Sequence, residues 1–151
     1  MQASEVAKHI IDYCISINNP VTNLKLQKML YFLDMYHLIN QHKRLITDEE
    51  FEAWDYGPVM RSVYNKYRLN GPLPINVWEN FTEKFPSDFE KFLYGFIDKL
   101  AKMYPSELIE ESHRPNTPWD IVYNKLELKY HKIPADLMKK CANHYRSQVK
   151  K

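Results

Sequence analysis

The stretch Thr22-Asn-Leu-Lys-Leu-Gln-Lys-Met-Leu-Tyr-Phe32 decides the fold class, because its apolar residues recur at helical spacing. Its first residue is a typical N-cap, and the pattern continues to about Asn40, so we predict a helix over that range. Further apolar side chains widen the stripe: Phe32, Tyr36 and Ile39. Such a wide apolar surface is typical of a central helix that is contacted from several sides.

A second informative stretch is Phe51-Glu-Ala-Trp-Asp-Tyr-Gly-Pro-Val59. Apolar and polar residues alternate through its first half, which predicts a short extended or β segment around residues 50–56, with Trp54 and Tyr56 on one face. Gly57-Pro58 reads as a turn, and we expect Pro58 to begin the next helix at its first position. That helix ends near Asn70-Gly71.

The remaining pattern is helical on both sides of a proline-rich linker at residues 72–86, with one helical turn expected at 77–81. We expect an N-cap at Ser4 for the first helix and a capping box of Ser87 and Glu90 for the helix after the linker. Shorter helices follow from Pro105, from Trp119 and from Pro134. The sequence therefore predicts a mainly α fold, a single-domain helical bundle of about six to seven helices that spans residues 1–151.

The composition of the chain disfavours several classes of function. Of 151 residues only three are glycine, and the net charge is +2, so neither a phosphate-cradling loop nor a strongly basic nucleic-acid surface is indicated. The beginning of the chain lacks a signal-peptide pattern, and no apolar run approaches the roughly 20 residues of a membrane span. We expect a cytoplasmic protein without membrane contact, in which Cys14 and Cys141 are free thiols.

The residues that usually carry chemistry do not form a known catalytic pattern, so we predict no enzyme activity, no cofactor and no metal. Two carboxylate–imidazole pairs at helical spacing, Asp34 with His37 and Glu110 with His113, are interpreted as solvated surface pairs rather than metal ligands. The acidic run 48–52 is interpreted as a solvated edge, with a basic partner as the alternative.

The two stretches resemble signatures of the SocA/GepA-like Panacea domain of bacterial and phage antitoxins. The matching residues are 22–32 and 51–59, continuing to Val63-Tyr64, and a looser match joins Ser112-His113 to Pro118-Trp119. The run Ala-Trp-x-Tyr-Gly-Pro-Val is the most specific part. This resemblance implies a mainly helical fold and an antitoxin role. Its partner is then a cognate toxin, neutralised by direct contact or delivered to a cytoplasmic protease unfoldase.

A DNA-binding regulator of a phage or toxin–antitoxin operon is the alternative. The first two predicted helices and the turn at residues 18–21 imitate a helix-turn-helix, with Lys25 and Lys28 near the start of the second helix. Against this reading, that second helix is too apolar to lie exposed in a DNA groove, so nucleic acid is the less favoured partner.

Candidate protein-binding residues come from the signature stretches. A polar pair inside an apolar helix needs partners, which are either the Gly57-Pro58 turn or another protein. The aromatic residues either pack in the core or keep a polar atom free for contact. The candidates are Gln27, Lys28, Tyr31, Trp54, Tyr56 and His113.

Overall fold

The computed structural model describes residues 1–149 and is mainly helical, as predicted. The described α-helices are α1 (Ala3–Ser16), α2 (Asn23–Gln41), α3 (Arg61–Tyr67), α4 (Glu90–Ala101), α5 (Pro105–Ser112), α6 (Pro118–Asp120) and α7 (Ala135–Val149). A 3-10 turn (Arg68–Asn70) follows α3 and a π-helical turn (Ile121–Lys125) follows α6. Within residues 1–149, no helix is both long and apolar enough to span a bilayer.

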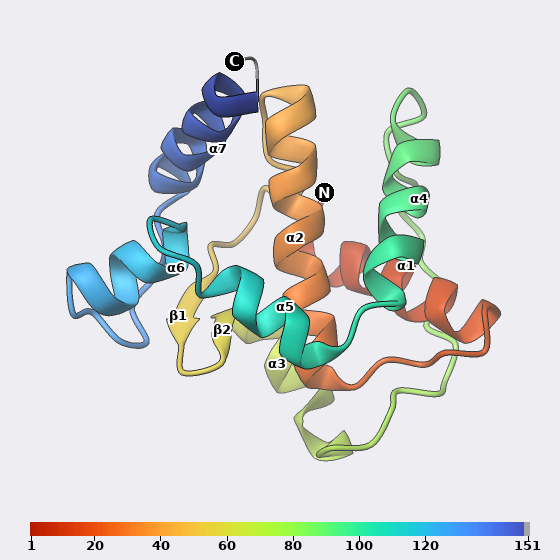
Figure 1. Cartoon of the computed structure of the whole chain (residues 1–151). Helices are drawn as coiled ribbons and strands as arrows, with labels where there is room; N and C mark the ends of the chain where they lie inside the picture. The colour runs from red at the N-terminus through yellow and green to blue at the C-terminus, as the bar shows by residue number, and fades with distance from the viewer. Residues whose placement is uncertain (150–151) are drawn as a thin grey trace.

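Helix α2 is the central element, which confirms the prediction from its wide apolar stripe. It packs against α1, α3, α4, α5 and α7, and Figure 1 shows α7 and α4 on opposite sides of it. At its start, the Thr22 side chain accepts a hydrogen bond from the amide of Lys25 at 3.2 Å, as the predicted N-cap requires. The helix ends at His42, whose φ of 61° is left-handed.

The predicted extended segment is one strand of a two-stranded antiparallel sheet, β1 (Glu52–Trp54) with β2 (Gly57–Val59). Phe51 and Ala53 are buried, as predicted, but Glu52 between them is buried too, so burial does not alternate along β1. The expectation that Pro58 begins a helix is wrong, because Pro58 pairs with Ala53 inside β2 and α3 begins at Arg61. A proline is tolerated here because β2 lies at the edge of the sheet and needs no amide donor from it.

The other edge of β1 is covered by residues 130–133, which sequence reasoning missed. Ala53 donates its amide to the carbonyl of His131 at 2.9 Å and accepts from the amide of Tyr130 at 2.7 Å. Ile133 donates to the carbonyl of Phe51 at 2.7 Å. The segment just before α7 is thereby tied to the hairpin.

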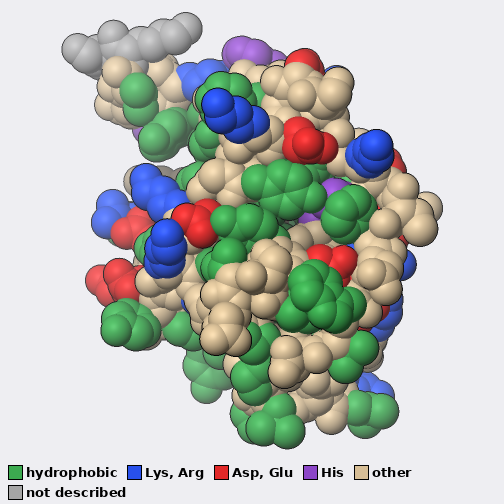
Figure 2. Space-filling model, turned by 90° about the vertical axis from the view of Figure 1, so that its right-hand side faces the viewer, with side chains coloured by type: hydrophobic (Ala, Val, Ile, Leu, Met, Phe, Trp, Pro, Cys, Tyr) green, Lys and Arg blue, Asp and Glu red, His purple; other side chains and the backbone are tan. Residues whose placement is uncertain are grey.

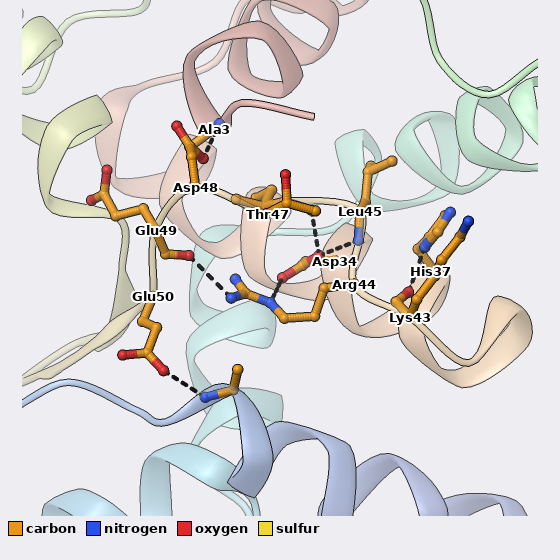
Figure 3. Close-up of polar contacts among 12 residues, drawn as sticks. Ala3, Asp34, His37, Lys43, Arg44, Leu45, Thr47, Asp48, Glu49 and Glu50 are labelled. Carbon is orange, nitrogen blue, oxygen red and sulfur yellow. Dashed lines mark hydrogen bonds and ion pairs between the residues drawn. The ribbon is translucent and has the colours of Figure 1, made fainter.

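The acidic run is only partly a solvated edge: Asp48 is exposed, Glu49 and Glu50 are half-buried, and their carboxylates accept hydrogen bonds from helix amides. Asp48 accepts from the amide of Ala3 at 2.9 Å, where α1 begins. Glu49 accepts from the amide of Ser62 in the first turn of α3, and Glu50 from the amide of Ala135 at the start of α7. Negative charge is favourable at helix N-termini. The run therefore anchors the starts of α1, α3 and α7, and Figure 3 shows the contacts of Asp48 and Glu50 beside the loop after α2.

The Asp34–His37 pair is also buried rather than solvated (Figure 3). The Asp34 carboxylate accepts from the Arg44 Nε at 2.7 Å and from the amides of Leu45 and Ile46. The Nδ1 atom of His37 lies 2.7 Å from the carbonyl oxygen of Lys43. Both side chains fix the loop that follows α2. Residues 1–149 hold no group of three or more His, Cys, Asp or Glu side chains placed to bind a metal ion.

The linker at residues 72–86 lacks the expected helical turn at 77–81. Two carboxylates on α1 hold this linker in an irregular path: Glu5 accepts from the amide of Glu83 at 2.6 Å, and Asp12 from the amide of Glu79 at 2.7 Å. The expected side-chain caps also fail. Gln2 rather than Ser4 precedes α1, and Phe89 precedes α4 without a capping hydrogen bond from its side chain.

Candidate functional site

The signature stretches meet in a pocket of about 460 Å³ between α2 and the β-hairpin. Four candidate residues line it: Gln27, Lys28, Trp54 and Tyr56. The other described lining residues are Asn23, Leu24, Asp55, Val59, Tyr64, Arg68, Gly71 and Tyr130. The helix and the hairpin, separated by a loop in the sequence, are thus brought together as one site.

Gln27 uses both ends of its amide inside the chain. Its Nε2 donates to Asn23 Oδ1 at 3.0 Å, one helical turn earlier. Its Oε1 accepts from the amide of Met60 at 2.8 Å, immediately before α3. The side chain is 1% exposed. Gln27 therefore joins α2 to the end of the hairpin. Of the two partners predicted for it, the hairpin turn or another protein, its hydrogen bonds are to the chain itself.

Lys28 is fully buried and donates from Nζ to the carbonyl of Pro58 at 2.8 Å. Burial disfavours the charged amine and lowers the pKa of Lys28 to about 7. Above it, Gly57 has a φ of +109°, and a Cβ there would lie 2.7 Å from Ser112 Oγ and 3.1 Å from Lys28 Cε. The hairpin therefore needs glycine at this position, both for its backbone conformation and for its close approach to α2 and α5.

Trp54 is half-buried at the mouth of the pocket and belongs to a polar cluster. Its Nε1 donates to Glu52 at 3.0 Å. Arg61 donates two hydrogen bonds to the same carboxylate, at 2.8 and 2.9 Å, and lies over the indole ring. The Arg61 guanidinium holds the pKa of Glu52 below its usual value. Sequence reasoning missed this bidentate pair because its members lie on opposite sides of the hairpin.

Tyr56 lies at the tip of the hairpin and is 67% exposed. It is in the turn, so the prediction that it shares a strand face with Trp54 was wrong. Its neighbour Asp55 accepts hydrogen bonds from the hydroxyls of Tyr123 and Tyr130, which hold the pKa of Asp55 below its usual value. These bonds fix the hairpin tip against the segment between α6 and α7, and leave Tyr56 as the exposed aromatic residue of the signature.

His113 and Tyr31 lie outside the pocket. The His113 ring stacks on Trp119 at 3.7 Å, and the Trp119 Nε1 donates to the carbonyl of Trp54 at 2.7 Å. Burial and the nearby Lys28 amine lower the pKa of His113. Tyr31 is 3% exposed and packs edge-on against Phe51. The candidate residues therefore do not share one surface, and the side-chain polar atoms of Gln27, Lys28 and Trp54 bind within the chain.

Comparison with known proteins identifies the family of this chain. The family described as "Antitoxin SocA-like, Panacea domain" matches residues 26–120, which include most of α2, the hairpin and Trp119. The protein "Antitoxin SocA" of Caulobacter vibrioides (strain NA1000 / CB15N) is 30% identical over 135 residues, covering 82% of this chain and 71% of that protein. No solved structure matches the chain. The chain therefore belongs to the SocA-like Panacea antitoxin family.

Proposed function

We propose that this chain is an antitoxin that neutralises a cognate toxin by direct protein–protein contact. The observation that carries the proposal is that polar side chains of the signature bind inside the chain, while most of the exposed large apolar side chains lie outside the signature. The polar groups of Gln27 and Lys28 bind within the chain, whereas large apolar side chains lie exposed elsewhere. Exposed apolar patches on a small soluble fold mark protein interaction sites.

One such patch comprises Leu69, Leu73, Val77, Trp78 and Phe81, named here the linker patch. Its members are between 36% and 96% exposed. Figure 2 shows hydrophobic side chains gathered over the lower half of the face that carries the linker. A second apolar surface lies between α4 and α7 and is described in the next subsection.

The packing of α2 and of its two lysines, Lys25 and Lys28, does not favour the DNA-binding alternative. The helix that would enter a DNA groove is α2, which is packed against other helices on several sides. Lys28 is buried, and Lys25 donates from Nζ to the carbonyl of Ala101 at 2.6 Å. Neither lysine is free to contact phosphate. A protein partner fits the exposed apolar surfaces better.

Co-expression with the open reading frame beside this chain's gene tests the proposal. We expect that frame to inhibit growth alone, that this chain restores growth, and that the two proteins co-purify. The matched control is a chain with Lys28→Glu, which places an unpaired carboxylate in the core and prevents folding. If the neighbour is not toxic, or if growth is restored without a complex being recovered, neutralisation by contact is refuted.

The amount of toxin separates sequestration from delivery to a protease. If the chain sequesters its toxin, the toxin accumulates in a stable complex. If the chain acts as an adaptor, the toxin disappears after synthesis is stopped, and it persists in cells that lack the ATP-dependent unfoldase. Pulse-chase measurement of toxin half-life, with and without this chain, gives the answer.

A further inference from the structure

A second, larger groove of about 1,200 Å³ lies along the C-terminal half of α2, between α4 and α7, whereas the hairpin pocket is lined by residues from the first two turns of α2. Its floor is formed by apolar side chains of α2, among them Met35 and Ile39. Its walls include Phe92 from α4 and Tyr145 from α7, which are 56% and 54% exposed. Tyr36 of the floor stacks on Phe96 of the wall at 4.2 Å, so the α4 side is a packed aromatic surface.

Gly95 lies in the middle of α4 and lines this groove. A Cβ added there would meet nothing within 4 Å, and the residue has ordinary helical geometry. Glycine inside a helix is destabilising relative to alanine, so a glycine with free space around it serves no purpose in the packing of this chain. It does let another backbone approach α4 closely.

The charge around the groove has one sign. Lys91 and Lys99 are exposed on α4, at four residues before and after Gly95, and so lie on the same helix face about 12 Å apart along the axis. Arg146 lines the groove from α7 and also donates to the carbonyls at the end of α2. Among the described lining residues the charged side chains are these three, and all are basic.

We propose that this groove is the toxin-binding surface, and that it takes an amphipathic helix of the toxin with acidic residues along its edges. The proposal rests on the antitoxin function proposed above. A groove with an apolar floor between two helices fits the apolar face of a third helix. The space over Gly95 allows close backbone approach, and the lysines at either end of that face pair with carboxylates on the incoming helix.

Two groove variants test the proposal against a matched control. Gly95→Leu fills the space and replaces glycine with a better helix former, and Lys91→Glu with Lys99→Glu reverses the charge. The control, Lys139→Glu with Lys140→Glu, makes the same change in net charge at exposed positions of α7 outside the groove. With the toxin encoded beside this gene as the probe, we expect each groove variant to weaken binding at least about tenfold, and the control to weaken it far less.

The two cysteines give an independent readout on the unmodified chain. Cys141 lines the groove and is half-buried, whereas Cys14 is fully buried, and both are free. Burial raises the pKa of Cys141, so alkylation with N-ethylmaleimide is followed at pH 8 by mass spectrometry. We expect the toxin to protect Cys141 in proportion to the fraction bound, while Cys14 stays unmodified throughout.

The outcomes separate this proposal from the proposed function. If the toxin binds but Cys141 reacts at its free rate and the groove variants bind normally, the groove assignment is overturned and the antitoxin function stands. Loss of binding on changing Trp78→Glu alone would place the interface on the linker patch instead. If light scattering shows a dimer of this chain that Gly95→Leu dissolves, the occupant is a second copy. If the wild-type chain does not bind the toxin, both proposals fail.

Discussion

Replacing Lys28 with methionine changes how the stability of this fold depends on pH. The folded chain holds the pKa of Lys28 near 7, against an ordinary value of 10.5. Between these values the unfolded state binds more protons than the folded state, so the free energy of unfolding rises with pH. For a shift of this size the rise between pH 7 and pH 9 is about 2 kcal/mol. Lys28→Met lacks this contribution.

Urea denaturation at pH 7, 8 and 9, followed by circular dichroism, measures the effect. The variant loses the hydrogen bond to the Pro58 carbonyl at every pH, at a cost of about 1–3 kcal/mol. The informative quantity is therefore the free energy of unfolding of wild type minus that of Lys28→Met, and this difference rises by about 2 kcal/mol between pH 7 and pH 9. Burial and the nearby Lys28 also lower the pKa of His113 from its ordinary 6.5, but that imidazole titrates below this range. Lys139→Met, at an exposed position, is the control and shows no such rise. Parallel curves for wild type and Lys28→Met would refute the reasoning.

Three further substitutions test the framework of the site. Gly57→Ala is expected to destabilise the fold by about 1–3 kcal/mol more than Gly71→Ala, because both have positive φ but only the first Cβ meets other atoms; equal losses in thermal denaturation would contradict this. Asp34→Asn leaves Arg44 without its ion pair and costs about 3–5 kcal/mol in urea denaturation, whereas a loss below about 1 kcal/mol would show that the pair is unimportant. Trp119→Phe removes the hydrogen bond to the hairpin carbonyl, costing about 1 kcal/mol, or roughly 2–4 °C in melting temperature; an unchanged melting temperature would count against that bond.

Local pattern was enough to predict the helical framework. The N-cap at Thr22 and the wide apolar stripe that follows depend on residues within a few turns of one another, and both are as predicted. The apolar spacing that predicted the burial of Phe51 and Ala53 is local as well. The prediction that Pro58 begins a helix failed because proline is favoured both in the first turn of a helix and at the edge of a sheet. Only the pairing across the hairpin decides between the two.

The polar architecture could not be predicted in this way, since its partners are distant in sequence. The acidic run looks solvated until α1, α3 and α7 place their first amides beside it. Lys28 and Gln27 required partners, and both predicted alternatives satisfied that requirement equally well. Their bonds to Pro58 and Met60 were decided by the tertiary fold.

The same internal bonds determine where partner specificity can reside. Glu50 accepts a hydrogen bond from the amide at the start of α7, and Arg146 near the end of α7 donates to carbonyls in the last turns of α2. The α7 wall of the groove is therefore held in place by hydrogen bonds that the fold itself requires. Lys91, Phe92 and Lys99 are exposed on the opposite wall. Substitutions at such positions cost the fold little. A scaffold built in this way permits the groove to be adapted to a different toxin while the pocket beneath the hairpin stays unchanged.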